Sequence, residues 1–287
     1  MRLTINYIAK RMNITSEAER NVAVALAEDV GAGDLTAQLI PADARAQARI
    51  ITRVDAILCG TAWSDACFRQ LDPGTQIEWL HQDGERITAG ATLSTVRGSA
   101  RALLTGERTA LNFLQLLSAV ASATRRYVDA VQGTRALIVD TRKTLPGLRL
   151  AQKYAVRSGG GANHRIGLYD GVLIKENHVA AAGGITAALV QAQRITPAGV
   201  WIQIEVETLQ QLEEALAAGA KLVLLDNMDL QQMRAAVGLN AGRAQLEASG
   251  GITLENVRAI AETGVDRISI GGLTKDVKAV DLSMRFN

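Results

Sequence analysis

IVDTRKTLPGLRLAQKYAVRSGGGANHRIGLYDGVLIKENHV, residues 138–179, contains two β-branched apolar runs separated by a helical segment and three consecutive glycines. The first run stops at Asp140-Thr141-Arg142-Lys143, and the second stops at Lys175. Seven arginines and lysines stand here against three acids. Guanidinium groups pair with carboxylates and phosphates, and ammonium groups with phosphates, so cations at strand ends favour a small ligand with several negative charges. The alternative is a solvated basic face beside a flexible glycine loop.

Apolar runs and helical stretches alternate from Ala136 onward, which is typical of βα units around a parallel sheet. Six units occupy about 140 residues, fewer than the roughly 250 of a complete eight-stranded barrel. The predicted fold class is therefore α/β: an incomplete, six- to seven-stranded parallel barrel of TIM type (residues 117–275) with a smaller N-terminal α+β sandwich domain (1–116, joined by 276–287). The six strand candidates are Ala136–Asp140, Gly171–Lys175, Trp201–Val206, Lys221–Asp226, Ala244–Ser249 and Asp266–Gly271.

The smaller domain is predicted to begin with a helix. Ser16-Glu17-Ala18-Glu19 has the pattern of a capping box, and Val22, Leu26 and Val30 follow on one face until Gly31 and Gly33 end the helix. Two strands with a helix between them complete the expected α+β pattern; the strands are Ala48–Leu58 and Thr75–Leu80, and the helix is Trp63–Gln70.

The stretch 83–98 resembles the hammerhead half of lipoyl and biotinyl carrier domains. Those carriers need a lysine on the hairpin turn, and no lysine stands between Arg11 and Arg142, so a carrier function is excluded. From Ser99 to about Gln132 the pattern is helical. Arg108 and Asn112 share one side of this helix, and Arg108 is either a ligand-binding residue or a solvated arginine. The apolar face consists of Leu103, Leu104, Leu111, Leu114, Leu117 and Val120.

The ends of the predicted barrel strands carry polar residues or glycine, at the edge where barrel enzymes place their reactive groups. The last two strands end in SGG and IGG, where glycines let backbone N–H groups approach a phosphate closely. Glu205 and Asp226 end neighbouring strands, and a carboxylate there is costly to bury without a partner. Either they bind a ligand or they form a structural salt bridge. The phosphate-binding candidates are Ser249, Gly250, Gly251, Ile270, Gly271 and Gly272.

Composition excludes several classes of protein. The formal net charge is only +2 and aromatic residues make up 3% of the chain, which argues against nucleic-acid binding. No apolar run is long enough for a membrane span, and the N-terminus has no apolar signal core. Cys59 and Cys67 follow no metal or disulfide pattern and are expected to be small core residues. We therefore expect a soluble, cytoplasmic protein.

Residues 140–178, DTRKTLPGLRLAQKYAVRSGGGANHRIGLYDGVLIKENH, resemble the signature of the quinolinate phosphoribosyltransferases. The segments EDVGAGDLT (28–36) and GERTALNFLQLLS (106–118) are similar to the N-terminal signature and linking helix of that family. The resemblance implies transfer of a phosphoribosyl group from phosphoribosyl pyrophosphate to the ring nitrogen of quinolinate, with loss of CO2, to give nicotinate mononucleotide and pyrophosphate. It also implies Mg²⁺ as cofactor and a homodimer, possibly assembled further, in which Arg108 enters the neighbouring subunit's site.

The resemblance also implies a role for each candidate site residue. Four residues, Arg108, Arg142, His164 and Arg165, would clamp the two carboxylates of quinolinate. Lys143 would neutralise the pyrophosphate, Thr141 would donate a hydrogen bond, and Lys175 would lie beside the carboxylate that is lost. Glu205 and Asp226 would bind the ribose hydroxyls and Mg²⁺, directly or through water, and stabilise the oxocarbenium-like ribose. His178 is equally well interpreted as a supporting residue or a loop histidine, and His81 as structural.

Three other kinds of function are alternatives: a Schiff-base aldolase, a related enzyme of the same fold and a non-catalytic sensor. A Schiff-base aldolase also has one lysine at a barrel strand end and a glycine phosphate site, but the many arginines argue against it. Related enzymes of the same fold are nicotinate phosphoribosyltransferase and the relative found with molybdate transport genes. The latter departs from the YDGVLIK pattern, which this chain retains. A non-catalytic metabolite sensor would not need both Glu205 and Asp226.

Overall fold

The computed structural model describes residues 13–286, and their contacts divide the chain into two compact units. The first unit comprises residues up to 125, 144–160 and 273 onward, and the second comprises 126–143 and 161–272. The domain boundaries predicted from the sequence, 1–116 with 276–287 and 117–275, are not tested by this division and stay a prediction. Each unit is described here by itself.

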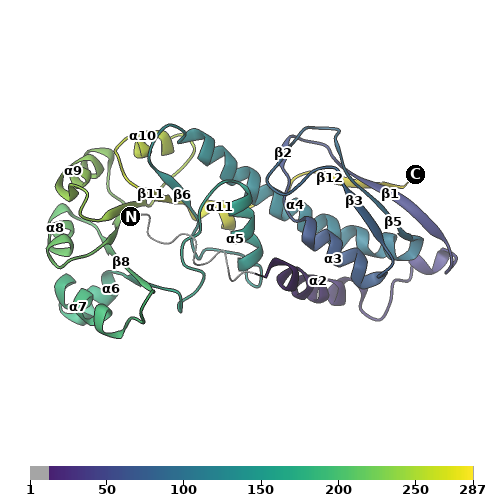
Figure 1. The fold of residues 1–287 in the computed structure, drawn as a ribbon, viewed down its shortest axis with the longest axis horizontal. Coiled ribbons are helices and arrows are strands. Elements are labelled where there is room, and N and C mark those ends of the chain that lie inside the picture. Colours follow the sequence, from purple (N-terminus) through teal and green to yellow (C-terminus); the bar gives the residue numbers. More distant parts are fainter. Residues whose placement is uncertain (1–12, 287) are drawn as a thin grey trace. The chain divides into compact units, whose positions relative to one another are not determined.

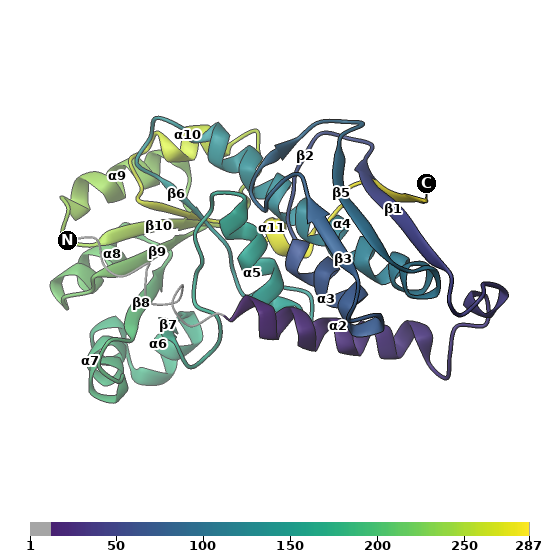
Figure 2. The same cartoon turned by 45° about the vertical axis from the view of Figure 1, so that its right-hand side comes forward.

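The first unit contains a four-stranded antiparallel sheet in the order β12-β1-β5-β3 (Figures 1 and 2). The last strand of the chain, β12, pairs with β1, so this sheet joins segments from both ends of the sequence. A second, two-stranded sheet pairs β2 with β4. The strands are β1 (Arg45–Thr52), β2 (Ala56–Ile57), β3 (Gln76–Trp79), β4 (Arg86–Ile87), β5 (Thr92–Ser99) and β12 (Leu282–Phe286).

Helices complete the first unit. The α4 helix is amphipathic, and its predicted apolar face is buried except at Leu104, which is 38% exposed; including Leu104 in that face was wrong. Trp63 of α3 is fully buried, and its indole N–H donates to Asn21 Oδ1 of α2 at 3.0 Å. The helices are α2 (Ile14–Val30), η1 (Ala37–Leu39), α3 (Thr61–Leu71), α4 (Ala100–Ala130, whose last turn counts with the second unit) and α5 (Arg149–Ser158).

Two predicted boundaries in this unit were wrong. Helix α2 begins at Ile14, because Asn13 caps it by accepting a hydrogen bond from the Ser16 N–H; Ser16 is the donor to the cap, not the cap itself. The predicted strand Ala48–Leu58 is two strands, because the Thr52 hydroxyl donates to the Val54 carbonyl at 2.6 Å and the chain turns there.

The second unit is a six-stranded parallel sheet in the order β6-β11-β10-β9-β8-β7. Figure 1 shows α7 to α10 along its outer side. The edge strands β6 and β7 are consecutive in the chain and form no ladder with each other, so the barrel is open between them. The predicted incomplete α/β barrel is thus confirmed with six strands: β6 (Leu137–Val139), β7 (Gly171–Ile174), β8 (Trp201–Val206), β9 (Leu222–Asp226), β10 (Gln245–Ser249) and β11 (Arg267–Ser269).

The strands are apolar because both faces of a parallel sheet are covered. Ile138, Ile204 and Leu225 are at most 2% exposed. Parallel pairing brings the carboxyl ends of the strands to one edge, where Ser249 lies opposite Asp226. The helices between the strands are α6 (Glu176–Ala182), α7 (Ile185–Ile195), α8 (Leu209–Ala217), α9 (Leu230–Asn240) and α10 (Val257–Ala261). The short helix α11 (Gly272–Lys275) follows β11, and all but its first residue count with the first unit.

Candidate active site

Lys175 and Glu205 meet at the carboxyl ends of β7 and β8. Lys175 directly follows β7, and its Nζ lies 3.6 Å from Glu205 Oε2. The lysine side chain is about half exposed, whereas the glutamate side chain is 12% exposed. His178 supports this corner, because its Nδ1 accepts the Lys175 backbone N–H at 3.0 Å at the start of α6. The ammonium group therefore faces the open side of the sheet edge beside a carboxylate.

Glu205 and Asp226 form an acidic pair at neighbouring strand ends. Burial raises the pKa of the Glu205 carboxyl above its ordinary value; Lys175 opposes this effect, and the nearby charge of Asp226 adds to it. Asp226 Oδ2 accepts a hydrogen bond of 2.8 Å from Asn227 Nδ2. The pair supplies hard oxygen ligands, the type that Mg²⁺ prefers. Among residues 13–286 no group of three or more His, Cys, Asp or Glu side chains could hold a metal, so any ion here needs further oxygens from a substrate or water.

Two guanidinium groups, those of Arg142 and Arg165, approach each other in the second unit. Arg165 is 8% exposed, and its Nη1 donates to the Gly171 carbonyl at 3.0 Å. Burial lowers the pKa of Arg165, and the charge of Arg142 lowers it further. Two like charges brought together in a partly buried place are stabilised by a bound anion, and the planar forks suit carboxylate oxygens.

Lys143 and Thr141 lie beside Gly271, which follows β11. The Thr141 hydroxyl oxygen accepts the Lys143 N–H at 3.0 Å. A Cβ at Gly271 would come within 2.9 Å of Lys143 Cδ and 3.6 Å of Thr141 Oγ, so the absence of a side chain lets the lysine stem pass over the backbone. The structure thus brings together the predicted anion-binding lysine and one of the two predicted phosphate loops.

The other predicted phosphate loop packs against Asn227. Gly250 has a φ of +99°, and a Cβ there would collide with Asn227 Oδ1 and lie 3.1 Å from the Asn227 backbone nitrogen. Asn227 itself has a φ of +53° and donates its N–H to the Ser249 carbonyl at 3.0 Å. The Asn227 turn therefore ties Asp226 to the Ser249-Gly250-Gly251 loop.

His164 is enclosed rather than exposed at the sheet edge. It is 6% exposed, its Nδ1 accepts the Arg165 backbone N–H at 2.9 Å, and its Nε2 lies 2.9 Å from Gln203 Oε1. Its ring stands edge-on to Trp201, with ring centroids 5.0 Å apart. Both ring nitrogens thus have protein partners, and the predicted direct contact with a substrate carboxylate stays a prediction.

Arg108 belongs to the first unit, in contrast to the other predicted ligands. It is an exposed residue of α4, whereas the remaining candidates all lie in residues 141–143, 164–175 and 205–272 of the second unit. Its predicted role, binding quinolinate in the site of a neighbouring subunit, therefore stays a prediction.

Four residues that matter for the arrangement of the site were missed by the sequence reasoning: Asp140, Gln203, Asn227 and Glu247. Asp140 is fully buried and holds the 163–164 loop, because its carboxylate accepts from the His164 N–H at 2.8 Å and from Asn163 Nδ2 at 2.6 Å. Gln203 and Glu247 each stand two residues before a predicted site residue, Glu205 and Ser249. Because side chains two apart on a strand face the same side, this spacing was the sequence signal that could have identified them.

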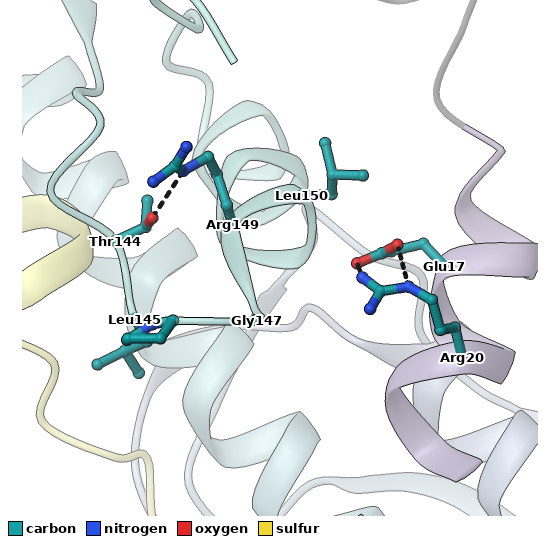
Figure 3. Close-up of a pocket in the computed structure, with 8 residues that line it drawn as sticks. Glu17, Arg20, Thr144, Leu145, Gly147, Arg149 and Leu150 are labelled. Carbon is teal, nitrogen blue, oxygen red and sulfur yellow. Dashed lines mark hydrogen bonds and ion pairs between the residues drawn. The ribbon is translucent and has the colours of Figure 1, made fainter. Parts of the chain in front are cut away.

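A separate pocket in the first unit contains none of the predicted site residues (Figure 3). Arg20 forms an ion pair with Glu17 at 2.7 Å on one side of it, and Arg149 Nε donates to Thr144 Oγ at 3.0 Å on the other. Its lining is Glu17, Arg20, Thr144, Leu145, Pro146, Gly147, Arg149 and Leu150.

The fold and the site define an α/β-barrel protein whose charged groups gather at the carboxyl ends of the strands, where barrel enzymes have their active sites. Comparison with known proteins narrows this class. Residues 120–285 match the model of the quinolinate phosphoribosyl transferase C-terminal domain, and residues 34–118 match that of the N-terminal domain. The chain therefore belongs to the quinolinate phosphoribosyl transferase family.

Individual relatives agree with this assignment. A probable nicotinate-nucleotide pyrophosphorylase (carboxylating) of Bacillus subtilis is 44% identical over 257 residues, which cover 90% of this chain and 89% of that protein. The structure of the nicotinate-nucleotide pyrophosphorylase from Francisella tularensis has a TM-score of 0.92 and 45% identity, covering 95% of this chain and 97% of that one. Human nicotinic acid phosphoribosyltransferase, at 16% identity and a TM-score of 0.60 over 95% of this chain and 73% of that one, shares the fold.

Proposed function

We propose that this protein joins quinolinate to phosphoribosyl pyrophosphate and releases pyrophosphate and CO2, giving nicotinate mononucleotide for NAD synthesis. The observation that supports this proposal is the buried guanidinium of Arg165 in the family-matched barrel, with the charge of Arg142 near enough to act on it, because two neighbouring cations suit a dicarboxylate. Lys175, the glycine loops and the acidic pair then supply the remaining chemistry. Family membership favours this reaction over the Schiff-base aldolase, the sensor and nicotinate phosphoribosyltransferase.

The reaction changes the pyridine ring at two positions, its nitrogen and the carbon beside it. The ring nitrogen forms a bond to C1 of the ribose while the bond from C1 to pyrophosphate breaks, which leaves the ring cationic. The carboxylate beside that nitrogen then leaves as CO2, its bonding electrons stay on the ring carbon next to N⁺, and a proton takes its place. In the proposed arrangement Arg142 and Arg165 hold the carboxylates, with His164 and the neighbour's Arg108, and Lys175 offsets the transient negative charge.

The phosphoribosyl donor is proposed to bind at the glycine loops and the acidic pair. Backbone N–H groups of the loops 249–251 and 270–272 would hold the 5-phosphate, Thr141 would donate a hydrogen bond and Lys143 would neutralise the pyrophosphate. Glu205 and Asp226 would bind the ribose hydroxyls and hold Mg²⁺, directly or through water. The ion would supply charge neutralisation for the pyrophosphate group.

The decisive experiment is a product assay. Purified protein with quinolinate, phosphoribosyl pyrophosphate and Mg²⁺ should release nicotinate mononucleotide and CO2 in equal amounts. Nicotinate in place of quinolinate is the control and should give no CO2. A Schiff-base adduct at Lys175, trapped by borohydride with a carbonyl sugar phosphate, together with no mononucleotide, would support the aldolase instead.

The metal requirement is tested separately. Because the donor carries four or more negative charges and the two carboxylates add to them, a divalent cation is needed at this end of the site. Excess chelator should therefore stop turnover, and added Mg²⁺ should restore it. Full activity in excess chelator would contradict the role of the ion. A Glu205→Gln, Asp226→Asn double variant should need more Mg²⁺ for half-maximal rate if these residues hold it.

The proposed assembly is a homodimer, and the proposed location is the cytoplasm. The two cysteines, Cys59 and Cys67, are buried and free, as expected of small core residues, and this is compatible with a reducing compartment. In the part of the chain that the structure describes, no helix is long and apolar enough to cross a bilayer. Light scattering of the purified protein and cell fractionation test the two proposals.

A further inference from the structure

A network of linked polar side chains, called the polar network below, runs through the interior of the second unit. Arg267 Nε of β11 lies 3.0 Å from Glu247 Oε2 of β10, and the same oxygen accepts from Gln203 Nε2 of β8 at 3.2 Å. Gln203 Oε1 in turn lies 2.9 Å from His164 Nε2. Glu247 is fully buried and Gln203 is 1% exposed. Three strands and the loop before β7 are thus linked by one ion pair and two hydrogen bonds.

The direction of each hydrogen bond in the polar network follows from the ion pair between Glu247 and Arg267 at one end of it. Glu247, ion-paired with Arg267, can only accept, so the amide nitrogen of Gln203 faces it. The amide oxygen of Gln203 therefore faces His164, whose Nε2 must carry a proton to donate. The other ring nitrogen is then the acceptor for the Arg165 backbone N–H at 2.9 Å. The polar network therefore selects one tautomer of His164. Through that ring it also holds the backbone from which the Arg165 side chain projects.

The polar network lies directly beneath the residues at the strand ends. Side chains two residues apart on a strand face the same side, so Gln203 lies one layer below Glu205, and Glu247 lies one layer below Ser249. Apolar side chains would fill this layer at a lower desolvation cost, because a buried ion pair seldom stabilises a fold more than hydrophobic packing does. A polar layer immediately beneath the strand ends can hold the site residues above it in fixed orientations through directional hydrogen bonds.

We propose that Gln203 and Glu247 are positioning residues for quinolinate binding. They hold His164 in the tautomer protonated on Nε2, and through the His164 ring they hold Arg165 where its guanidinium meets a carboxylate of the substrate. The inference rests on the proposed role of Arg165 in binding quinolinate. It assigns no contact between substrate and either Gln203 or Glu247.

The kinetic test compares two substitutions of one residue. Gln203→Leu removes the acceptor for His164 and should raise the KM for quinolinate about tenfold or more, while the KM for phosphoribosyl pyrophosphate changes less than about twofold. Gln203→Glu keeps an acceptor for His164 and should restore most of the quinolinate affinity at about pH 6.

Asn240→Ala is the matched control for loss of buried hydrogen bonds. Asn240 exchanges two hydrogen bonds with Ala244, of 2.8 and 2.9 Å, before the start of β10 and therefore at the opposite edge of the sheet. This variant should lower the unfolding midpoint without changing the KM for quinolinate. The inference is wrong if Gln203→Leu behaves like this control, or if it raises both KM values equally.

Nitrogen NMR of the imidazoles gives a readout that does not depend on activity. The chain has three histidines, so removing His81 and His178 in turn assigns the His164 signals. Wild type and Gln203→Glu at low pH should show His164 protonated on Nε2, and Gln203→Leu should show a mixture of tautomers. A wild-type His164 protonated on Nδ1 alone would overturn the inference, even if Gln203→Leu does not fold. A protein with the expected tautomer but no mononucleotide product would contradict the proposed function instead.

Discussion

At the residue scale, Lys175 is the side chain whose removal should separate catalysis from folding. Its side chain is 47% exposed and makes an ion pair with Glu205, an arrangement that contributes little to stability. We expect Lys175→Ala to lower kcat by about a hundredfold or more while the unfolding midpoint stays within about two degrees. Lys221→Ala, an exposed lysine that precedes β9 at the other edge of the sheet, is the control and should leave both unchanged. A large fall in the midpoint of Lys175→Ala would support a structural salt bridge.

The pKa of Glu205 makes a second prediction at this scale. Because burial raises that pKa in the folded state, the folded protein binds this proton more tightly than the unfolded chain does. The contribution of Glu205 to stability therefore falls as pH rises from the ordinary value of 4.5 through the raised one. Glu205→Gln should unfold at a higher urea concentration than the wild type above this window, and at the same concentration below it. A less stable variant at neutral pH would mean that the pair with Lys175 outweighs burial.

At the scale of elements, the β10–α10 loop can be tested with two neighbouring glycines. Both Gly250 and Gly251 have positive φ, but a Cβ at Gly250 would meet Asn227, whereas nothing lies within 4 Å of one at Gly251. Gly251→Ala should cost about 1 kcal/mol of unfolding free energy from backbone strain alone. Gly250→Ala should cost about 2 to 3 kcal/mol and also raise the KM for phosphoribosyl pyrophosphate, because Asn227 and the loop must move apart. Equal effects of the two substitutions in urea unfolding and kinetics would contradict the proposed contact.

At the scale of the whole molecule, the proposed dimer shares its sites between subunits. If Arg108 acts in the neighbour's site, Arg108→Ala and Lys175→Ala chains should be inactive alone and regain activity when unfolded and refolded together. A mixed two-fold dimer has one site with both lesions and one with neither, so random pairing leaves about a quarter of all sites intact. Each variant refolded with itself is the control. Mixed dimers verified by mass but without activity would place Arg108 in its own chain's site or on an inert surface.

The sequence by itself determined the features that depend on neighbouring residues. The six barrel strands could be predicted to within two residues, because each is a short apolar run ended by polar residues or glycine. The charged residues at the strand ends could be predicted for the same reason, since parallel strands bring their carboxyl ends to one edge. The family motif of residues 140–178 then indicated the chemistry of that edge.

Only the tertiary structure decided which polar side chains meet inside the molecule. Gln203 reaches His164 across 39 positions of sequence and Glu247 across 44, distances over which no periodicity carries information. The break after Thr52 and the left-handed backbone of Asn227 likewise depend on local hydrogen bonds that propensities do not reveal. The grouping of residues 144–160 with the first unit also lies beyond sequence patterns. Hydrophobic periodicity reports which face of an element is buried, whereas the partner of a buried polar atom is set by how distant elements pack.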